Sequence, residues 1–445
     1  MSSPVQPDKK AIRISAEDAA ALVQPGMWVD YGFGLGQPDV FDAALAARKT
    51  ALRDIRIRNS LSVRPRAVLE CDPDCETFAI FNWHFGGYDR RKHDAGQVNY
   101  IPMNFGEAPD LYRRFIERVD VACIRACPKD SNGIFNFGPA GSYQKAMLER
   151  ARIVIIEIAP QMPYVHGPEN GVHESQIDFV IDGDGREMVE APNPPISDID
   201  RAIAKYVAAE IEDGACLQIG IGGTPNAVCS MIAEAGVRDL GVHSEMMVDG
   251  IVDLHDAGLI SGARKSIDKG KVVFTFALGT KRQYDLINNN PAMICHPVDY
   301  TNLPHNIMRN DRVFSINSTT QMDLQGQAVS ESDGFRHLSG TGGQLQFVRG
   351  AYASKGGKSF ICLSSTYDKR GEPRSRIVCE LTPGNIVTTP RTDTMYVVTE
   401  YGMANLKGKS VAERAKALIA IAHPAFREKL EREARQNNIL PRWFR

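Results

Sequence analysis

Short hydrophobic stretches separated by turns run along the chain and predict alternating strands and helices. The best apolar run, Ile153–Ile158, has the length of one buried strand. Between Asp198 and Asp213 the apolar residues recur at helical spacing, at Ile203, Tyr206, Val207 and Ile211. Ser197 or Asp198 is suited to cap the start of this predicted helix, and Gly214 is suited to end it.

One order of elements occurs twice: a strand, a glycine turn, a helix and a next strand. In the first copy these are the strand Met27–Tyr31, the turn Gly32–Pro38 and the helix Asp39–Arg48. In the second copy they are the strand Cys216–Ile219, the turn Gly220–Pro225 and a helix that ends at Gly236. This order is typical of a βαβ unit, so the sequence predicts an α/β fold with parallel strands and two similar domains.

The boundary between the two domains is predicted at Glu190–Asp198, where three prolines fall within four positions. Proline fixes φ and has no backbone N–H, so neither a helix nor a central strand continues through this segment. We expect one domain over residues 1–190 and a second over residues 197–445.

Composition narrows the class of protein. The chain has 445 residues, 43% of them hydrophobic and 24% charged, and a formal net charge of −2. These values are typical of a globular enzyme and give no electrostatic reason to expect nucleic acid or a membrane as a partner. The polar segment Met1–Arg13 lacks the apolar core of an export signal. The nine cysteines fit reduced thiols in a cytoplasmic protein rather than a disulfide framework.

A carboxylate beside a donor-rich turn is the first candidate for chemistry. The predicted strand Leu240–Ser244 ends at Glu245, and the glycine turn before Thr224 and Pro225 lies on a neighbouring strand end. Thr224 is a good N-cap with Pro225 at the first helical position, so the turn offers unpaired N–H groups. A nucleophile next to an oxyanion hole needs this arrangement. On the pattern alone, an exposed glutamate that caps the following helix is the somewhat better interpretation.

A second glycine segment, Ser339–Gln344 (SGTGGQ), opens the amphipathic stretch Leu345–Ala353. Its amides are suited to bind an oxyanion, although a tight turn for close helix packing explains the same glycines. His166 and His173 match no familiar metal-ligand spacing, so we expect no metal site.

Several ordered segments resemble the acetyl-CoA hydrolase/transferase family, which includes butyryl-CoA:acetate, 4-hydroxybutyrate and itaconate CoA-transferases. The main ones are Gly220–Val228 (GIGGTPNAV), Gly241–Gly250 (GVHSEMMVDG) and Ser339–Gly350 (SGTGGQLQFVRG). The resemblance extends over nearly the whole chain through Asn136–Gly138, Met162–Gly167, Phe314–Ser318, Val398–Gly402 and Gly408–Ala415.

The resemblance implies two tandem α/β domains with mainly parallel sheets, and a CoA-transferase that works through a covalent glutamyl-CoA thioester. Glu245 matches the nucleophile of the family. The matching oxyanion and CoA-binding positions are Gly220, Ile221, Gly222, Gly223, Thr224, Gly342 and Gly343. Asn317 is expected to support the glutamate or an intermediate oxygen, and Lys369 to contact CoA. A nucleophile of this kind must be ionised to attack, so Glu245 has no need of a raised pKa.

The resemblance also implies the substrates, which are an acyl-CoA and a short-chain carboxylate, with no permanently bound cofactor and no metal. We expect a cytoplasmic homo-oligomer. The acid is expected to bind in the first domain, near Tyr31, Arg90, Arg91 and Asn104, where a cation would suit a dicarboxylate. Two alternatives stay open: an acyl-CoA hydrolase that uses the same glutamate, and a non-catalytic acyl-CoA-binding protein.

Overall fold

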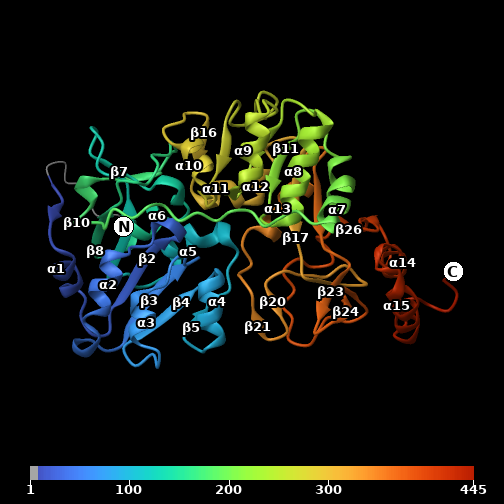
Figure 1. Ribbon diagram of the computed structural model, residues 1–445, viewed down its shortest axis with the longest axis horizontal. Helices are drawn as coiled ribbons and strands as arrows, with labels where there is room; N and C mark the ends of the chain where they lie inside the picture. Colours follow the sequence, from blue (N-terminus) through green and yellow to red (C-terminus); the bar gives the residue numbers. More distant parts are fainter. Residues whose placement is uncertain (1–8, 445) are drawn as a thin grey trace. The chain divides into compact units, whose positions relative to one another are not determined.

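The computed structural model describes residues 9–444, so Arg445 and residues 1–8 of the polar N-terminal segment lie outside the described residues. The chain divides into two compact units (Figure 1). Among the described residues, 9–191 and 273–301 form the first unit, and 192–272 and 302–444 form the second. One division point therefore falls inside the proline-rich segment Glu190–Asp198, while residues 273–301 join the first unit although they follow the start of the second.

The first unit contains an eight-stranded, fully parallel sheet with the order β1-β10-β8-β6-β2-β3-β4-β5. Its strands are β1 (Ile12–Arg13), β2 (Trp28–Phe33), β3 (Ile55–Ser60), β4 (Phe78–Asn82), β5 (Val98–Tyr100), β6 (Val121–Ala126), β8 (Ile153–Ile158) and β10 (Phe179–Asp182). A short antiparallel pair is formed by β7 (Ile134–Asn136) and β9 (Gly171–His173).

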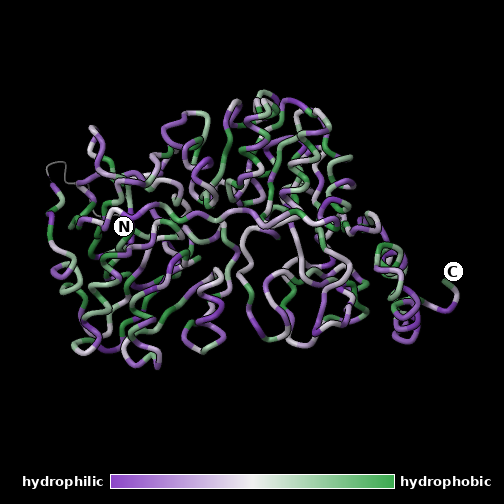
Figure 2. Tube along the Cα trace, viewed as in Figure 1, coloured by the Kyte–Doolittle hydropathy of each residue, from purple (hydrophilic) through white to green (hydrophobic). Residues whose placement is uncertain are grey.

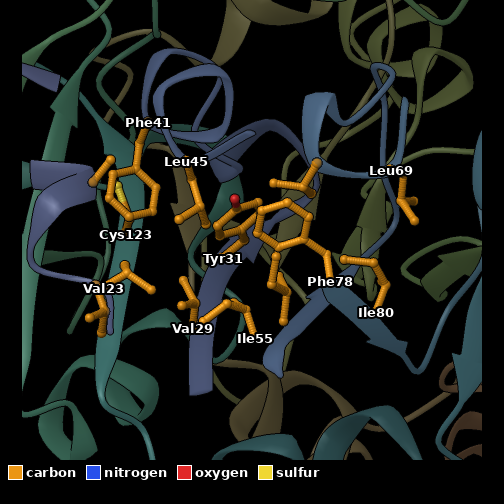
Figure 3. Packing of buried hydrophobic residues seen from close by; sticks show 14 of the residues in the cluster. Val23, Val29, Tyr31, Phe41, Leu45, Ile55, Leu69, Phe78, Ile80 and Cys123 are labelled. Carbon is orange, nitrogen blue, oxygen red and sulfur yellow. The ribbon is translucent and has the colours of Figure 1, made fainter. Parts of the chain in front are cut away.

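Helices cover both faces of this sheet because its strands bury side chains in both directions. The helices are α1 (Ala16–Ala21), α2 (Val40–Ala46), α3 (Ala67–Cys71), α4 (Gly87–Asp94), α5 (Ala108–Arg114) and α6 (Gln144–Arg150). Val29 and Tyr31 of β2 point to the core that α1, α2 and α3 complete, and Figure 3 shows Tyr31 among Phe41, Leu45 and Phe78. Successive strand residues face opposite sides, and Asp30 accepts a hydrogen bond from Tyr112 of α5 at 2.7 Å.

Residues 273–301 contribute further elements to the first unit. They include β15 (Phe276–Ala277), α10 (Lys281–Ile287), β16 (Met293–Cys295) and most of α11 (Val298–Asn302), while β14 (Val272–Phe274) crosses the division point. The ring of Phe276 lies 4.8 Å from the ring of Phe33 at the end of β2, and the Ser142 N–H donates to the Thr275 carbonyl at 3.1 Å. The late segment therefore packs against the first unit at Phe33 and Ser142.

The second unit has a parallel sheet with the order β12-β11-β17-β22-β26, to which β27 adds an antiparallel hairpin strand. The strands are β11 (Cys216–Ile219), β12 (Gly241–His243), β17 (Val313–Ser318), β22 (Lys358–Cys362), β26 (Tyr396–Thr399) and β27 (Gly402–Asn405). The helices are α7 (Asp198–Ala208), α8 (Gly223–Ala235), α9 (Asp249–Asp256), α12 (Pro304–Ile307), α13 (Gln344–Ala353), α14 (Val411–Ile421) and α15 (Pro424–Gln436).

Smaller strands complete the second unit: β13 (Met246–Met247), β18 (Gln321–Asp323), β19 (Ala328–Val329), β20 (Ser332–Asp333), β21 (Arg336–His337), β23 (Thr366–Lys369), β24 (Glu372–Ser375) and β25 (Ile377–Val378). The strands β19, β18 and β25 form a small sheet, and β20–β21 and β23–β24 form hairpins. Two α/β units with mainly parallel sheets confirm the predicted fold class.

The helix predicted at Asp198–Asp213 begins where the sequence places it and ends earlier. Ser197 caps α7 with a reciprocal bond: its hydroxyl accepts from the Asp200 N–H, and the Asp200 carboxylate accepts from the Ser197 N–H. The helix ends at Ala208, so the apolar residue Ile211 packs from a turn. Figure 2 shows short hydrophobic stretches separated by hydrophilic turns. No helix of residues 9–444 combines the length and the apolar character needed to cross a membrane.

Candidate active site

The register of two neighbouring parallel strands places Glu245 at one edge of the second sheet. Cys216 of β11 pairs with Gly241 of β12, and Leu217 pairs with Val242. Both strands run in the same direction, so the glycine turn after β11 and Glu245 after β12 both follow carboxyl ends of the sheet. Ligands of open α/β sheets bind outside these ends.

Two donors from distant parts of the chain hold the Glu245 carboxyl. The Asn302 side-chain amide donates to Oε2 at 2.5 Å, and the Gly343 backbone N–H lies close enough to this carboxyl to lower its pKa. Asn302 is the last residue of α11, and Gly343 directly precedes α13. The predicted neighbours Glu245 and Gly343 are thus brought together in the second unit.

Gly343 approaches the carboxyl so closely that only glycine fits there. A Cβ atom at this position would lie 2.3 Å from Glu245 Oε2 and 2.4 Å from Asn302 Nδ2. Gly342, immediately before it, has a φ of +56°, in the left-handed region that favours glycine. The paired glycines of SGTGGQ therefore serve a close backbone approach to the carboxyl and a left-handed turn, in addition to starting α13.

Removal from water sets the acidity of Glu245. Its side chain is half-buried by accessible surface, and desolvation raises its pKa from 4.5 to about 7, against the opposing hydrogen bonds from Asn302 and Gly343. The pKa is raised even though the nucleophile must ionise, because the surrounding protein removes much of the water and the two neutral donors only partly offset this loss. Perturbed acids of this kind occur at functional sites.

The glycine turn Gly220–Gly223 has the irregular backbone expected of a ligand-facing loop. Gly222 has a φ of +121° and is the N-cap of α8, which begins at Gly223. The predicted N-cap, Thr224, lies inside the first turn, and its hydroxyl donates to Asp200 Oδ1 at 2.5 Å. The assignment of Thr224 as N-cap is therefore wrong, because Asp200 of α7 engages its side chain. Ile221 is 65% exposed at the tip of the turn.

Asn317 belongs to a buried polar network and does not reach the glutamate. Its side-chain amide donates to Gln218 Oε1 at 3.0 Å and to Ser315 Oγ at 2.9 Å, and its oxygen accepts from Gln218 Nε2 at 3.2 Å. This network lies under the glycine turn, because a Cβ on Gly220 would stand 3.5 Å from Asn317 Oδ1. Within residues 9–444 the amide that binds Glu245 is Asn302, not Asn317.

Asn302 is the site residue that the sequence did not reveal. It stands 57 positions after Glu245 and belongs to none of the segments that carry the family resemblance. Asparagine occurs throughout helix ends and turns, so no pattern distinguishes it. Lys369, which is expected to contact CoA, lies at the exposed end of the hairpin β23–β24, opposite Glu372.

Among the residues expected to read the acid, Tyr31 lies in the core of the first unit and the others lie nearer its surface. Tyr31 is fully buried in the core and its hydroxyl donates to Asp42 at 3.0 Å, which contradicts its assignment to a pocket. Arg90 and Arg91 lie in α4, with Arg91 exposed. Burial and the Arg90 charge lower the pKa of His84 to about 4. Asn104 donates to Glu107 Oε1 at 3.0 Å.

No group of three or more histidine, cysteine, aspartate or glutamate side chains that could hold a metal ion occurs among the described residues. The groups that the structure brings together at this site are a carboxyl with a pKa of about 7, a side-chain amide and backbone donors.

Comparisons with known proteins place the chain in a family. The model of the acetyl-CoA hydrolase/transferase N-terminal domain matches residues 6–190, and the model of the C-terminal domain of the same family matches residues 279–434. Together these stretches cover more than half of the chain.

Individual relatives align over most of their length. A butyryl-CoA:acetate CoA-transferase of Anaerostipes caccae is 46% identical over 428 residues, 96% of each chain. A 4-hydroxybutyrate coenzyme A transferase of Clostridium kluyveri is 44% identical over 348 residues, which are 78% of this chain and 80% of the relative. The crystal structure of RipA from Yersinia pestis has a TM-score of 0.89 at 36% identity and covers 97% of this chain and 98% of its own. The chain therefore belongs to the acetyl-CoA hydrolase/transferase family.

Proposed function

We propose that the protein is an acyl-CoA:carboxylate CoA-transferase with Glu245 as its covalent nucleophile. The observation that carries the proposal is the Glu245 carboxyl held between the Asn302 amide and the Gly343 N–H at the carboxyl edge of a parallel sheet. Residue 245 lies between the two stretches that the family models match, so this geometry supports the assignment independently of those models. Relatives named CoA-transferases that cover nearly the whole chain support the reaction class.

In the first half-reaction an oxygen of the ionised Glu245 attacks the carbonyl carbon of the acyl-CoA thioester. The tetrahedral oxyanion collapses, the C–S bond breaks, and the products are an acyl-glutamyl anhydride and the CoA thiolate. The thiolate then attacks the Glu245 Cδ, the anhydride C–O bond breaks, and the first acid leaves as a carboxylate. A glutamyl-CoA thioester remains on the protein.

The second half-reaction reverses these steps with a different acid. An oxygen of the incoming carboxylate attacks the Glu245 Cδ, and the CoA thiolate leaves. The thiolate attacks the acyl carbon of the new anhydride, which releases the new acyl-CoA and returns Glu245 as a carboxylate. The free energy of the thioester is kept throughout, so the reaction requires neither a nucleotide nor a metal.

Backbone donors are proposed to stabilise each oxyanion. The candidates are the N–H groups of Ile221–Gly223 and of Gly342 and Gly343, because both glycine turns have the left-handed backbone that allows amides to converge on one atom. One well-placed donor in such a hole contributes about 3 kcal/mol to the stability of the transition state. Asn302 is proposed to orient Glu245 and to bind the intermediate oxygen on its carbon.

The substrates in this proposal are an acyl-CoA and a short-chain carboxylate of the butyrate or 4-hydroxybutyrate type, since relatives that carry these names are 44–46% identical. Arg90 and Arg91 stay candidates for an acid site in the first unit, and Lys369 for a contact with CoA. A homo-oligomer in the cytoplasm completes the proposal.

Mass spectrometry of the intact protein after treatment with butyryl-CoA, without an acceptor, tests the mechanism. Wild-type protein should gain the mass of CoA less one water, located at Glu245, and Glu245→Gln should gain nothing. The transfer rate of Glu245→Gln should fall by at least about 10³-fold. Glu428→Gln is the matched control, because the Glu428 side chain is 96% exposed on α15 and should behave as wild type.

An acceptor panel separates transfer from hydrolysis. Thioester loss that depends on acetate, butyrate, 4-hydroxybutyrate, succinate or itaconate supports a transferase and ranks the acids. Equal loss of butyryl-CoA without any acid would make the protein a hydrolase with the same glutamate. Full transfer by Glu245→Gln would contradict the covalent mechanism itself.

A further inference from the structure

The loop that presents Gly343 to Glu245 has little internal rigidity. It joins β21 to α13 over residues 338–343, and three of these six residues are glycines. Glycine has the largest backbone freedom of any residue, so a loop of this composition samples many conformations unless other groups hold it. The Gly343 N–H nevertheless has to meet a carboxyl oxygen at one position.

A buried carboxylate, Glu331, bonds to this loop at two points. The Leu338 N–H donates to the Glu331 carbonyl at 2.8 Å, and the Thr341 hydroxyl donates to Glu331 Oε1 at 3.3 Å. Glu331 directly precedes β20, and the hairpin β20–β21 returns the chain from Glu331 to Leu338. The side chain of Glu331 thus spans the base of the hairpin and reaches the middle of the glycine loop.

The other oxygen of Glu331 is bound to a rigid part of the small sheet. The Thr388 hydroxyl donates to Oε2 at 3.0 Å and accepts from the Ser330 N–H at 3.0 Å. The backbones of Thr388 and Thr389 bond to Ala328 of β19 in both directions. Gln344, the first residue of α13, donates from its side chain to the Thr389 hydroxyl at 3.1 Å. The middle of the loop, through Glu331, and its C-terminal end, through Gln344, are therefore both linked to residues 388–389.

Glu331 is a carboxylate that is buried without a cationic partner among the described residues. Glu331 is 3% exposed, and the side-chain partners that the structure gives its carboxyl are two threonine hydroxyls rather than a cation. Desolvation raises its pKa, and the hydrogen bonds from Thr388 and Thr341 oppose the rise. A buried acid without an ion pair carries a free-energy cost that a purely structural position would avoid with a neutral side chain.

We propose that Glu331 is a positioning residue, which holds the glycine loop through Thr341 and thereby sets the Gly343 N–H against Glu245. The inference rests on the proposed role of Glu245. Glu331 takes no part in bond making, because its oxygens face Thr341 and Thr388. Its contribution is to keep a donor aimed at the reacting carboxyl through a loop that would otherwise be mobile.

Two substitutions at Thr341 test whether its hydrogen bond to Glu331, the tether, holds the loop. Both leave Glu331 itself unchanged. Thr341→Val keeps the shape but removes the hydroxyl, and Thr341→Ser keeps the hydroxyl. We expect kcat to fall about tenfold in the valine variant, with KM for acyl-CoA nearly unchanged, and to stay within about twofold of wild type in the serine variant. Glu331→Gln should also lower kcat. Amide hydrogen exchange of residues 338–343 should be faster than in wild type in both Thr341→Val and Glu331→Gln.

The pH profile gives a readout that a merely structural role would not move. The groups that face the Glu245 carboxyl are the neutral Asn302 amide and Gly343 N–H, and Glu331 is the titratable group bound to the loop. A misplaced Gly343 N–H stabilises the carboxylate less, so the acid limb of kcat/KM should move to higher pH in Thr341→Val and in Glu331→Gln, but not in Thr341→Ser.

The outcomes separate the inference from the proposed function. If Thr341→Val keeps the kcat and the acid limb of wild type while Glu245→Gln is inactive, the positioning role of Glu331 is contradicted. The assignment of Glu245 as the nucleophile would still stand. A folded Glu245→Gln with full transfer would overturn the proposed function. Equal loss in the serine and valine variants would also contradict the inference, because the serine hydroxyl retains the hydrogen bond.

Discussion

The side-chain amide of Asn302 donates to Oε2 of Glu245 at 2.5 Å, and this contact joins residues 57 positions apart in the sequence. The same oxygen lies so near Gly343 that no side chain fits between them. An amide and a main-chain N–H, both neutral, therefore orient a carboxyl that burial makes weakly acidic. Five measurements follow from this geometry and from the fold that supports it.

Removal of the Asn302 amide should impair catalysis more than stability. We expect Asn302→Ala to lower kcat about 10²-fold, because Glu245 loses the donor that orients it and that stabilises its ionised form. Steady-state kinetics with butyryl-CoA and acetate measure the effect. The control is Asn132→Ala, since Asn132 lies on an exposed turn. Equal activity of Asn302→Ala and wild type would show that Gly343 alone suffices.

A single methyl group at position 343 should disrupt the site. In Gly343→Ala the new Cβ would lie 2.3 Å from Glu245 Oε2, so either the loop or the carboxyl has to move. We expect at least about a 10²-fold loss of kcat/KM. Gly87→Ala is the matched control, because the nearest atom to a Cβ there is 3.9 Å away and the residue starts a helix. Activity of both variants at the wild-type level would contradict the close approach.

The activity should depend on pH in the neutral range. The pKa of Glu245 is about 7, and the nucleophile is the ionised form. As the pH falls below 7, kcat/KM should therefore decrease about tenfold per pH unit. This limb belongs to the free enzyme. A profile that stays flat from pH 8 down to pH 5 would show that Glu245 ionises at its ordinary pKa.

The same shift predicts how stability depends on pH. The pKa of Glu245 is raised on folding from 4.5 to about 7, so the native state binds a proton more tightly than the unfolded state. The resulting stabilisation is fully present below pH 4.5 and is lost as the pH rises through 7, on the order of 3 kcal/mol in all. Urea unfolding measures this effect. From pH 5 to pH 8 the free energy of unfolding of wild type should fall relative to that of Glu245→Gln. Parallel behaviour of the two proteins would contradict the shift.

Tyr31→Phe distinguishes a core residue from a pocket residue. The Tyr31 hydroxyl donates to Asp42, which is itself buried, so its removal leaves a carboxyl oxygen without that donor. We expect a loss of about 1–3 kcal/mol in the free energy of unfolding, with KM for the acid unchanged. Denaturant unfolding and acceptor kinetics measure both. A changed KM at unchanged stability would return Tyr31 to the acid site.

The sequence predicted the fold well because hydrophobic periodicity and turn residues act locally. Strand Cys216–Ile219, the helix that ends before Gly236 and the cap at Ser197 are all set by neighbours within a few positions. Tyr31 was misplaced because alternate residues of a strand buried on both faces have no polar side to distinguish them. Thr224 was misplaced because a carboxylate on another helix, Asp200, competes for its hydroxyl.

The site was only partly predictable. The pairing of Glu245 with Gly343 followed from family resemblance, whereas Asn302 carries no signal of its own. Its role arises where three chain segments converge, and no spacing within one segment encodes that convergence. The pKa of Glu245 is likewise a property of the assembled surroundings.

The division of the chain has a consequence for synthesis. The first unit needs residues 273–301, whose Phe276 packs on Phe33 and whose Cys295 N–H bonds to the His166 carbonyl. During synthesis, residues 192–272 therefore leave the ribosome before the first unit can be completed. Until residues 273–301 have left the exit tunnel, Phe33 lacks its aromatic partner Phe276. In that interval the uncovered aromatic side chains are available to chaperones.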